Sequence, residues 1–376
     1  MGAPASVAKV PLLDLSRQWK GLEEEVLAEV RRVFAEQDFI LGQRVEALEK
    51  EVAAYCAAPH GVACASGTDA ILLTLKALGA GPGDEVVTTP FTFFATAGAI
   101  WNCGARPVFA DIEPGSFNID PAAAEAAMGP KTKAILPVHL FGRCAAMGPL
   151  LEAAARRRIP LVEDMAQAIG AEWRGRRAGS MGDAGTLSFY PSKNLGGSGD
   201  GGMVVTSRKD LEETLRRARN HGMSRQYLHE FVGTNSRLDG LQAAVLRAKL
   251  RRLDAWSGAR AANARRYDER LAGLQGVRTP EPSTEGRHVY NQYTIRCERR
   301  DALKEHLGKN GIGTAIYYPV PLHLQPCFAS LGLKEGAFPE SERAAREVLS
   351  LPVFPELTGE EQETVVARIR EFYAGR

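Results

Sequence analysis

Apolar residues near the start of the chain recur at helical spacing. Over residues 22–34 they fall three or four positions apart, and the spacing returns over 45–52. Such spacing places apolar side chains on one face of a helix. We therefore predict amphipathic helices in the N-terminal region.

From residue 62 onward the pattern changes to short apolar runs that alternate with helical stretches. Seven such runs follow one another: VACAS, EVVTTP, RPVFADI, KAILPVHLF, IPLVED, GTLSFYP and GGMVVTS. Alternation of strands with helices is typical of a mostly parallel sheet covered by helices. The sequence therefore predicts an α/β protein.

The last third of the chain carries a different pattern. A helical pattern beyond Leu238 has no strong breaker until Gly273, and it is long enough to bridge two domains. A strand-like VYNQYTIR, a helical DALKEHLGKNG and a proline-rich YYPVPLHLQP follow. We expect a large domain at 1–245, and a bridging helix with a smaller α/β domain at 246–376. The N-terminal segment is a candidate to pack on the smaller domain.

Composition and charge exclude several classes of protein. With 44% hydrophobic and 24% charged residues, the 376-residue chain matches globular proteins rather than disordered or fibrous ones. Its 47 basic and 45 acidic residues argue against nucleic acid or a membrane surface as a partner. The cysteines lack the close spacing of zinc or redox pairs, so no metal site is expected. No signal peptide and no membrane helix are expected, which favours a cytoplasmic location.

Candidate functional residues lie where the strands are predicted to end, because open α/β sheets bind ligands there. In CASGTDA a strand meets a helix at Gly67 and Thr68. Backbone N–H groups at a helix start, together with the helix dipole, favour a phosphate. The motif therefore indicates a phosphate site, although Ser66 and Asp69 are equally good candidates for simple helix caps.

A carboxylate is expected at the end of the buried strand in IPLVEDMAQA. Asp164 closes this strand, and Gln167 follows three residues later. A buried carboxylate needs a cationic partner. In a pyridoxal enzyme that partner is the protonated pyridine nitrogen, and Gln167 could reach the phenolic oxygen. On its own, the segment favours the simpler interpretation of Glu163 and Asp164 as ordinary strand-end carboxylates.

A lysine follows the next strand in LSFYPSKNLGGSGDGG. Ser188 ends the strand, and Lys193 comes five residues later, directly before a glycine-rich turn. A lysine that bonds to an aldehyde must lose its proton, so it should lie in a sheltered pocket that lowers its pKa. The glycines let the backbone approach a cofactor, and Ser188 offers a hydroxyl to a phosphate. The alternative, a solvated loop cation, leaves this combination unexplained.

Three phenylalanines stand at the strand-to-helix junction in TPFTFFATAGAI. A flat ring at this place can stack on a flat cofactor. Phe93 is the predicted stacking residue, and Phe91 and Phe94 are expected to belong to the core.

The chain resembles the DegT/StrS family of sugar aminotransferases, which have the type I fold of pyridoxal-phosphate (PLP) enzymes. The resemblance spans nearly the whole chain and rests on these motifs, in the family's order: SGTDA, PFTFFAT, EDMAQAIGA, SFYPSKNLG with GDGG, GTNSRLDGLQAA and YYPVPLHLQ. It implies a large domain with a mostly parallel mixed sheet flanked by helices, and a smaller C-terminal α/β domain. Met165 and Ile169 depart from the family's usual residues, which affects the substrate assignment only.

The resemblance also implies roles for the residues found above. The expected cofactor is PLP, or pyridoxamine phosphate (PMP) once it has accepted an amino group, joined to Lys193 as a Schiff base. Asp164 is expected to contact the pyridine nitrogen and Gln167 the phenolic oxygen, and Phe93 to stack on the ring. Phosphate contacts are expected from Gly67, Thr68 and Ser188.

Members of this family work as homodimers whose active sites are completed across the interface. By position in GTNSRLDG, Asn235 is expected to contact the phosphate bound in the partner subunit. Arg237 is expected either to join Asn235 in this contact or to pair structurally with Asp239. Tyr318 and His323 are candidate substrate contacts, although a tyrosine beside proline often only packs and a single histidine is often a surface or core residue.

The implied reaction is a transamination in amino-sugar biosynthesis. An amino acid, expected to be L-glutamate, gives its amino group to the cofactor, and a keto sugar nucleotide then receives it, with Lys193 as general acid and base. The segment HGMSRQYLHEFVGTNSRLDGLQAAVL favours 3-keto over 4-keto sugars. Two alternatives stay open: a keto cyclitol or another non-nucleotide substrate, and a non-catalytic regulatory protein with the same fold.

Overall fold

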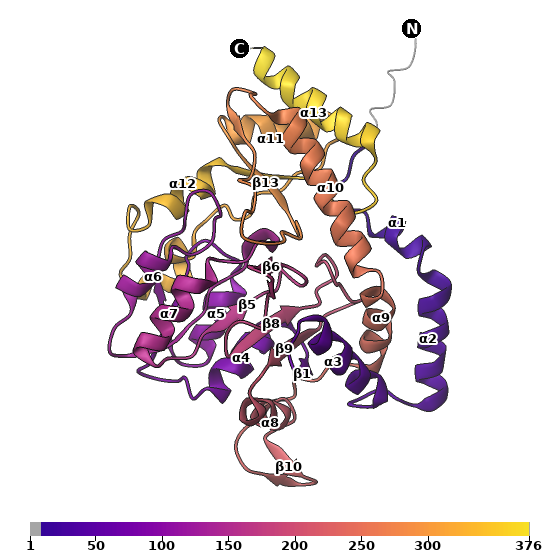
Figure 1. Ribbon diagram of the computed structural model, residues 1–376, viewed down its shortest axis with the longest axis vertical. Helices are drawn as coiled ribbons and strands as arrows, with labels where there is room; N and C mark the ends of the chain where they lie inside the picture. The colour runs from indigo at the N-terminus through magenta and orange to yellow at the C-terminus, as the bar shows by residue number, and fades with distance from the viewer. Residues whose placement is uncertain (1–8, 376) are drawn as a thin grey trace.

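The computed structural model describes residues 9–375 (Figure 1). Its α-helices are α1 (Leu15–Lys20), α2 (Glu23–Glu36), α3 (Gln43–Tyr55), α4 (Gly67–Ala77), α5 (Ala95–Asn102), α6 (Pro121–Ala127), α7 (Met147–Arg157), α8 (Lys209–Ala218), α9 (Gly240–Leu250), α10 (Leu253–Leu271), α11 (Arg300–Lys309), α12 (Pro339–Glu347) and α13 (Gly359–Ala374). Its strands are β1 (His60–Cys64), β2 (Glu85–Thr88), β3 (Arg106–Phe109), β4 (Thr132–Ile135), β5 (Val162–Asp164), β6 (Glu172–Trp173), β7 (Arg176–Arg177), β8 (Ala184–Ser188), β9 (Gly202–Thr206), β10 (Met223–Arg225), β11 (Leu228–His229), β12 (Val277–Arg278), β13 (Tyr293–Cys297) and β14 (Val348–Leu351).

The first eight residues, where no signal peptide is expected, lie outside the described range. Within residues 9–375, no helix is both long and apolar enough to cross a membrane.

The central sheet consists of two hydrogen-bonded parts that adjoin. One part has the order β3–β2–β4 with parallel pairings, and the other has the order β1–β9–β8–β5. Parallel bridges from Ile135 to Leu161 and from Val138 to Asp164 connect the two parts. β9 runs antiparallel to both of its neighbours. The sheet is therefore mostly parallel and mixed, as the sequence predicts, and each of the seven apolar runs contains or overlaps one of its strands.

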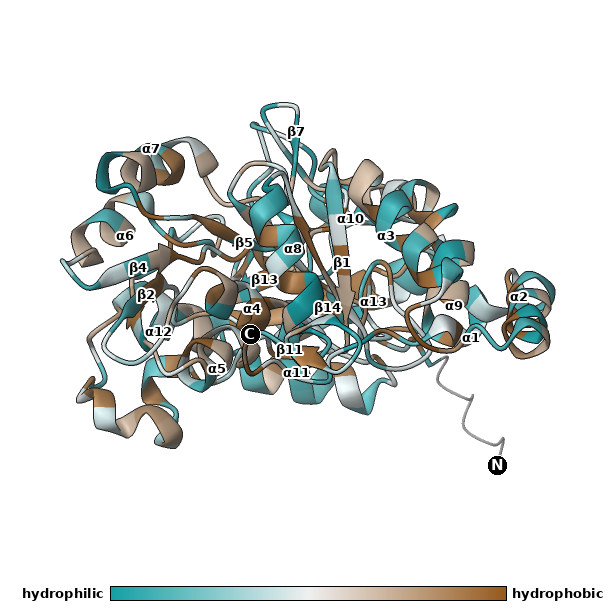
Figure 2. Cartoon of the chain, turned by 90° about the horizontal axis from the view of Figure 1, so that it is seen from below, coloured by the Kyte–Doolittle hydropathy of each residue, from teal (hydrophilic) through white to brown (hydrophobic). Residues whose placement is uncertain are grey.

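Helices cover both faces of this sheet. Val86 and Val204 lie in one apolar core, whereas their neighbours Val87 and Val205 lie in another. Because successive strand residues point to opposite faces, the two cores lie on opposite sides of the sheet. Helices α4, α5 and α8 pack on the first side, and α3, α7 and α9 pack on the second. Figure 2 shows hydrophobic strands in the middle of the molecule and a hydrophilic outer turn at β7.

The predicted N-terminal helices are confirmed as α2 and α3. The long helical pattern after Leu238 differs from a single bridge, because it forms two helices, α9 and α10, separated at Arg251 and Arg252. Both arginines form ion pairs with Glu25 of α2. Neither glycine nor proline marks this break, so residue spacing could not reveal it.

A third apolar core lies in the C-terminal part of the chain, at the top of Figure 1. It joins α10, α11 and α13 to the antiparallel sheet β12–β13–β14. Val10 also belongs to this core: its N–H donates to the Gly311 carbonyl at 3.0 Å, and its carbonyl accepts from the Gly313 N–H at 2.8 Å. We propose that this N-terminal segment and residues 246–376 form the smaller domain, with the large domain ending at residue 245.

Candidate active site

A cavity of about 480 Å³ opens at the carboxyl ends of the central strands. The predicted residues that line it are Gly67, Thr68, Phe93, Asp164, Gln167, Ser188, Lys193 and Tyr318. Further lining residues, which were not among the predicted site residues, include Thr92, Thr96, Tyr190, Asp200, Gln292 and Tyr317. Segments far apart in the sequence therefore meet at this one cavity.

The start of α4 forms part of the cavity wall and packs closely against the end of β8. A Cβ atom on Gly67 would lie 2.6 Å from the Cβ atom of Ser188, so no larger residue fits there without a shift. On β9, a Cβ atom on Gly202 would lie 2.2 Å from the Ser66 carbonyl oxygen. The side chain of Ser66 also caps α4, accepting from the Asp69 N–H at 3.1 Å. This helix start combines a cap with the backbone geometry of an anion site.

Asp164 ends β5, and its carboxylate is buried. Its Oδ2 atom accepts from the Thr96 hydroxyl at 2.9 Å, and its Oδ1 atom accepts from the Ala166 N–H at 3.2 Å. No cationic side chain within the described range forms an ion pair with it. Burial raises the pKa of Asp164, and Thr96, Ala166 and Lys193 only partly oppose that shift. A buried carboxylate in this state is suited to a positively charged ligand group.

The neighbouring Glu163 has a different environment. Its carboxylate faces Nε2 of the buried His139 at 2.9 Å. It also accepts backbone N–H groups at 2.8 Å from Gly179, Met181 and Gly182. Glu163 is thus a structural strand-end carboxylate, whereas Asp164 lines the cavity. The interpretation as an ordinary strand-end carboxylate therefore holds for Glu163.

Lys193 lies in the turn after β8, where its N–H donates to the Tyr190 carbonyl at 2.9 Å. Burial lowers the pKa of its amine to about 8, and the nearby Asp164 opposes this shift. The amine makes no hydrogen bond to another residue in the range 9–375, and it faces the cavity lining. An amine with this pKa is partly unprotonated near neutral pH and is therefore available as a nucleophile.

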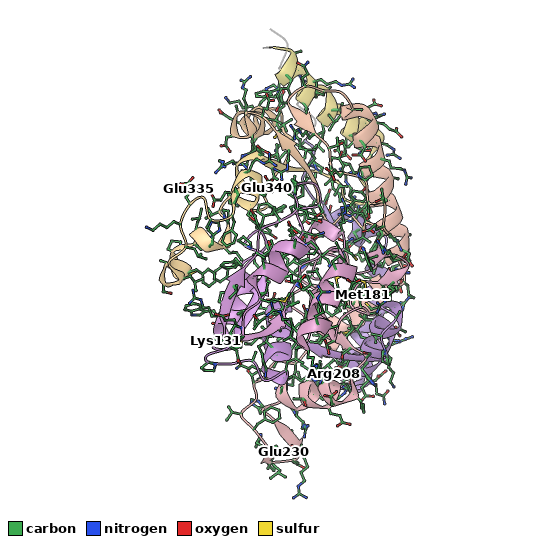
Figure 3. The ribbon with its side chains drawn as sticks, turned by 60° about the vertical axis from the view of Figure 1, so that its left-hand side comes forward. Lys131, Met181, Arg208, Glu230, Glu335 and Glu340 are labelled. Atoms are coloured by element: carbon green, nitrogen blue, oxygen red, sulfur yellow. The ribbon has the colours of Figure 1, made fainter. Side chains whose placement is uncertain are left out.

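The rate at which the apoprotein binds PLP covalently should follow this pKa. Below the pKa, the unprotonated fraction of an amine rises about tenfold per pH unit. The rate of attachment should therefore rise with pH and level off above about 8. Stopped-flow absorbance on the apoprotein measures this rate, and Lys131→Ala, at the exposed lysine labelled in Figure 3, should keep the same profile. If the rate still rises tenfold per pH unit at pH values close to the ordinary pKa of a lysine amine, the assignment is contradicted.

Gln167 lies in the turn after β5, and both ends of its amide are engaged. Its Oε1 atom accepts from the Phe141 N–H at 2.7 Å, and its Nε2 atom donates to the Tyr318 hydroxyl at 3.0 Å. A side-chain amide carries two N–H groups, so one remains free to donate into the cavity. Tyr318 is thereby tied to the residue predicted to contact the cofactor's phenolic oxygen.

Phe93 lines the cavity with 55% of its surface exposed, whereas Phe91 is fully buried. The ring centroid of Phe93 lies 6.1 Å from that of Tyr318. Phe94 is half-exposed rather than buried, and it stacks on Phe328 at a centroid distance of 5.7 Å. Of the three rings, Phe93 is therefore the one that is free to stack on a flat ligand in the cavity.

Asn235 and Arg237 do not line the cavity of the single chain. Asn235 is exposed, and its backbone forms a bridge with Asn220. Arg237 donates to the Asn220 side-chain carbonyl at 3.1 Å, and within residues 9–375 it forms no ion pair with Asp239. The structural alternative for Arg237 is therefore a pairing with Asn220 rather than with Asp239.

His323 does not line the cavity either. Its side chain is buried, with Nε2 at 3.0 Å from Oε1 of Glu342 and the ring against Phe338. Burial lowers the pKa of His323, and the Glu342 carboxylate opposes that shift. In this chain His323 occupies a core position, so the structure does not bring it together with the other predicted substrate contact, Tyr318.

A model of the DegT/DnrJ/EryC1/StrS aminotransferase family matches residues 20–370. The chain belongs to the DegT/DnrJ/EryC1/StrS aminotransferase family. This membership confirms four predictions made from the motifs: the family, the fold class, the enzyme class and the PLP cofactor.

Similar members of the family carry two kinds of name. The "pleiotropic regulatory protein" of Geobacillus stearothermophilus is 51% identical, over 97% of this chain and 98% of that protein. The UDP-N-acetyl-3-dehydro-α-D-glucosamine 3-aminotransferase of Acidithiobacillus ferrooxidans is 45% identical, also over 97% and 98%. Among solved structures, S. venezuelae DesV in complex with a ketimine intermediate is 45% identical with a TM-score of 0.95, covering 97% of this chain and 98% of DesV.

The cavity fits the cofactor of this aminotransferase family in three respects. The start of α4 at Gly67 has the backbone geometry of an anion site, Asp164 is a buried carboxylate that forms no ion pair among residues 9–375, and the Lys193 amine has no hydrogen-bond partner in the same range. PLP carries a phosphate, a basic ring nitrogen and an aldehyde, which correspond to these three features. The residues present are therefore suited to hold it.

Thr96 contributes to the site without having been predicted. It stands in the first turn of α5, and its hydroxyl reaches Asp164, which lies 68 residues away in the sequence. Its position three residues after the predicted stacking residue Phe93 was the available signal. A threonine in a helical turn is common, however, and only the folded chain identifies its partner.

Proposed function

We propose that this protein is a PLP-dependent aminotransferase that moves an amino group from an amino acid, expected to be L-glutamate, to a keto sugar nucleotide. The observation that carries the proposal is that Lys193, with its lowered pKa, and the buried Asp164 line one cavity with the start of α4. A 3-keto sugar is the favoured acceptor, because a relative at 45% identity is named for a 3-dehydro sugar nucleotide. The expected pathway is amino-sugar biosynthesis.

Two residues have the central chemical tasks. Bound PLP supplies an electron sink for the bonds that break at the carbon atom bearing the amino group. Asp164 holds the proton on the ring nitrogen, because a buried carboxylate is stabilised by a cation beside it. Lys193 would hold the cofactor, and its Nζ atom, once released from that bond, would move the proton between the two carbon atoms that exchange it.

The other cavity residues bind and orient the cofactor. The free N–H of Gln167 would donate to the phenolic oxygen, and the exposed face of Phe93 would cover the ring. Residues proposed to bind the phosphate are Gly67, Thr68 and Ser188. Tyr318 supports Gln167 through their hydrogen bond, so its task includes orienting a cofactor contact.

The acceptor can be identified from the absorbance of the cofactor. The protein is loaded with PMP and offered a panel of 3-keto and 4-keto nucleotide sugars together with keto cyclitols. We expect a 3-keto nucleotide sugar to return the PLP spectrum most rapidly. Conversion by cyclitols alone would support the non-nucleotide alternative, and conversion by no panel member would contradict the proposed function.

A second candidate is a non-catalytic regulatory protein with this fold, which the name of the Geobacillus relative favours. Such a protein has no need for an amine of lowered pKa beside a buried carboxylate, so the cavity supports the enzyme. The two candidates differ in one measurement. After unbound PLP has been removed, the enzyme should retain a PLP absorbance band, whereas a protein that has lost the chemistry should retain none.

We further propose that the protein is a homodimer and that the β10–β11 hairpin, residues 221–234, contacts the second copy. The hairpin projects beyond α8 at the bottom of Figure 1, and Glu230 marks the same projection in Figure 3. At this projection Tyr227 is 86% exposed and Val232 is fully exposed. Exposed apolar side chains that gather on a projecting segment are typical of protein interfaces. Asn235 stands at the base of this hairpin, consistent with its predicted role in the partner's site.

The double variant Tyr227→Ser, Val232→Ser should shift the protein from dimer towards monomer, because it removes the apolar area proposed to be buried between subunits. Size-exclusion chromatography with light scattering measures the shift. Glu230→Gln, on the same hairpin, alters only an exposed ion pair with Arg217 and should leave the dimer intact. A monomeric wild type, or a double variant that stays fully dimeric, would contradict the proposal.

The expected cytoplasmic location stays a proposal of the same kind. Its support is that the six cysteines in the described residues are all free, as is usual in a reducing compartment.

A further inference from the structure

Gln292 lines the active-site cavity from the C-terminal part of the chain. It directly precedes β13, and it also borders a smaller adjoining cavity lined by Phe117, Phe141 and His288. The residues proposed to hold the cofactor come from the large domain instead. Gln292 therefore stands where a substrate that extends away from the cofactor would pass.

The side-chain amide of Gln292 has no hydrogen-bond partner among the described residues. Its Oε1 atom is buried without a partner. Its Nε2 atom is not among the buried unpaired atoms, and it donates to no residue in the range 9–375. Gln167 differs, because both ends of its amide are engaged. A buried amide oxygen without a partner is unfavourable for folding. Because the amide can rotate about its last bond, either its donor or its acceptor end can meet a ligand.

The backbone around Gln292 is held from two sides. The N–H of Gln292 donates to the Phe141 carbonyl at 3.4 Å. The buried guanidinium of Arg260, on α10, donates to the carbonyls of Tyr290 and Asn291 at 3.2 and 3.3 Å. A side chain on a fixed backbone loses less conformational freedom when it binds a ligand. The free amide is thus presented by a rigid support.

We propose that Gln292 recognises the sugar ring of the acceptor by hydrogen-bonding a ring hydroxyl. The inference rests on the proposed function and deepens it. A neutral amide both donates and accepts, which matches a hydroxyl, whereas the carboxylates of the amino donor are best bound by cations. A site built to pair with a hydroxyl also rejects analogues that lack it. Gln292 is therefore a specificity-determining residue for the second half of the reaction.

The variant Gln292→Met tests this role, because methionine keeps the length of the side chain and removes both hydrogen-bonding groups. We expect the KM for the acceptor that the wild type uses best to rise about tenfold. The rate at which L-glutamate converts bound PLP to PMP should not change. Isothermal titration with the amino sugar nucleotide product should show the same loss of affinity. Between acceptors that differ by one ring hydroxyl, the wild type should discriminate and the variant should not.

Gln275→Met, at an exposed position after α10, is the matched control and should behave as the wild type. Thermal unfolding is an independent readout: Gln292→Met should be at least as stable as the wild type, because it removes a buried oxygen atom that has no partner. An unchanged acceptor KM, a loss confined to the glutamate half, or a lower Tm with equal losses in both halves would overturn the assignment. A wild type that converts no panel sugar would instead reject the proposed function, so the two failures are distinguishable.

Discussion

Replacing Lys193 by alanine should lower turnover by about 10⁴-fold, the upper end of what general acid–base catalysis contributes. The side chain is proposed both to hold the cofactor and to move the proton, and no other lysine is among the lining residues of the cavity within the described chain. The fold should remain intact. Because the pKa of Lys193 is lowered to about 8, its charged form is unfavourable in the folded state at pH 7. Steady-state assays and thermal unfolding measure the two effects.

Two further measurements separate chemistry from packing at Lys193. Added methylamine should restore part of the lost turnover, because it supplies the missing amine. Borohydride reduction of the holoenzyme followed by peptide mapping should place the cofactor on Lys193. Lys131→Ala, at an exposed lysine, should retain full activity. A label on another lysine, or substantial turnover by the alanine variant without added amine, would disprove the role.

Asp164→Asn should reduce the rate of both half-reactions by about 10²–10³-fold, as expected for loss of one electrostatic contact in an active site. The neutral amide has nearly the same shape as the carboxylate but cannot hold a proton on the ring nitrogen. Single-turnover absorbance with L-glutamate measures the rate, and the spectrum of the bound cofactor should change as well. Asp301→Asn, at an exposed aspartate, should have no effect. A full rate in Asp164→Asn would remove the proposed pyridine contact.

The same variant should make the apoprotein more stable at pH 7. Burial raises the folded-state pKa of Asp164 above its ordinary value of 3.8, so the folded state binds more protons than the unfolded state. Its contribution to stability therefore falls as pH rises from that ordinary value through the raised pKa, and asparagine removes this penalty. This gain in the free energy of unfolding should vanish below about pH 4, where Asp164 is neutral in both the folded and the unfolded state. Denaturant unfolding of the apoproteins at both pH values measures the difference.

Residues that end buried strands were the most predictable part of the site. Asp164 and Ser188 close apolar runs, and parallel strands bring their carboxyl ends to one edge, so their proximity follows from the pattern. Lys193 could be inferred because it combines a sheltered position with adjacent glycines. The same logic recovered the central sheet strand by strand. What these predictions share is that local sequence and sheet geometry suffice for them.

Other features depend on tertiary contacts, and the local sequence was not sufficient to predict them. Thr96 and Gln292 become site residues only when α5 and the segment before β13 reach the cavity. β14 was not predicted, because a short apolar run beside a helix does not reveal its pairing with β13. His323 was a candidate substrate contact because of its neighbours in the motif, but in the folded chain its side chain is buried beside Glu342. Asn235 lies outside the cavity, and its predicted role needs a second chain.

The hydrogen bonds of Val10 have a consequence for how this protein is made. Its partners Gly311 and Gly313 leave the ribosome long after it does, and Arg17 pairs with Glu361, which emerges later still. All strands of the central sheet end by Thr206, so that sheet can assemble before these partners are synthesised. The segment from Val10 to Arg17 instead gains these partners only after Gly311, Gly313 and Glu361 have been synthesised.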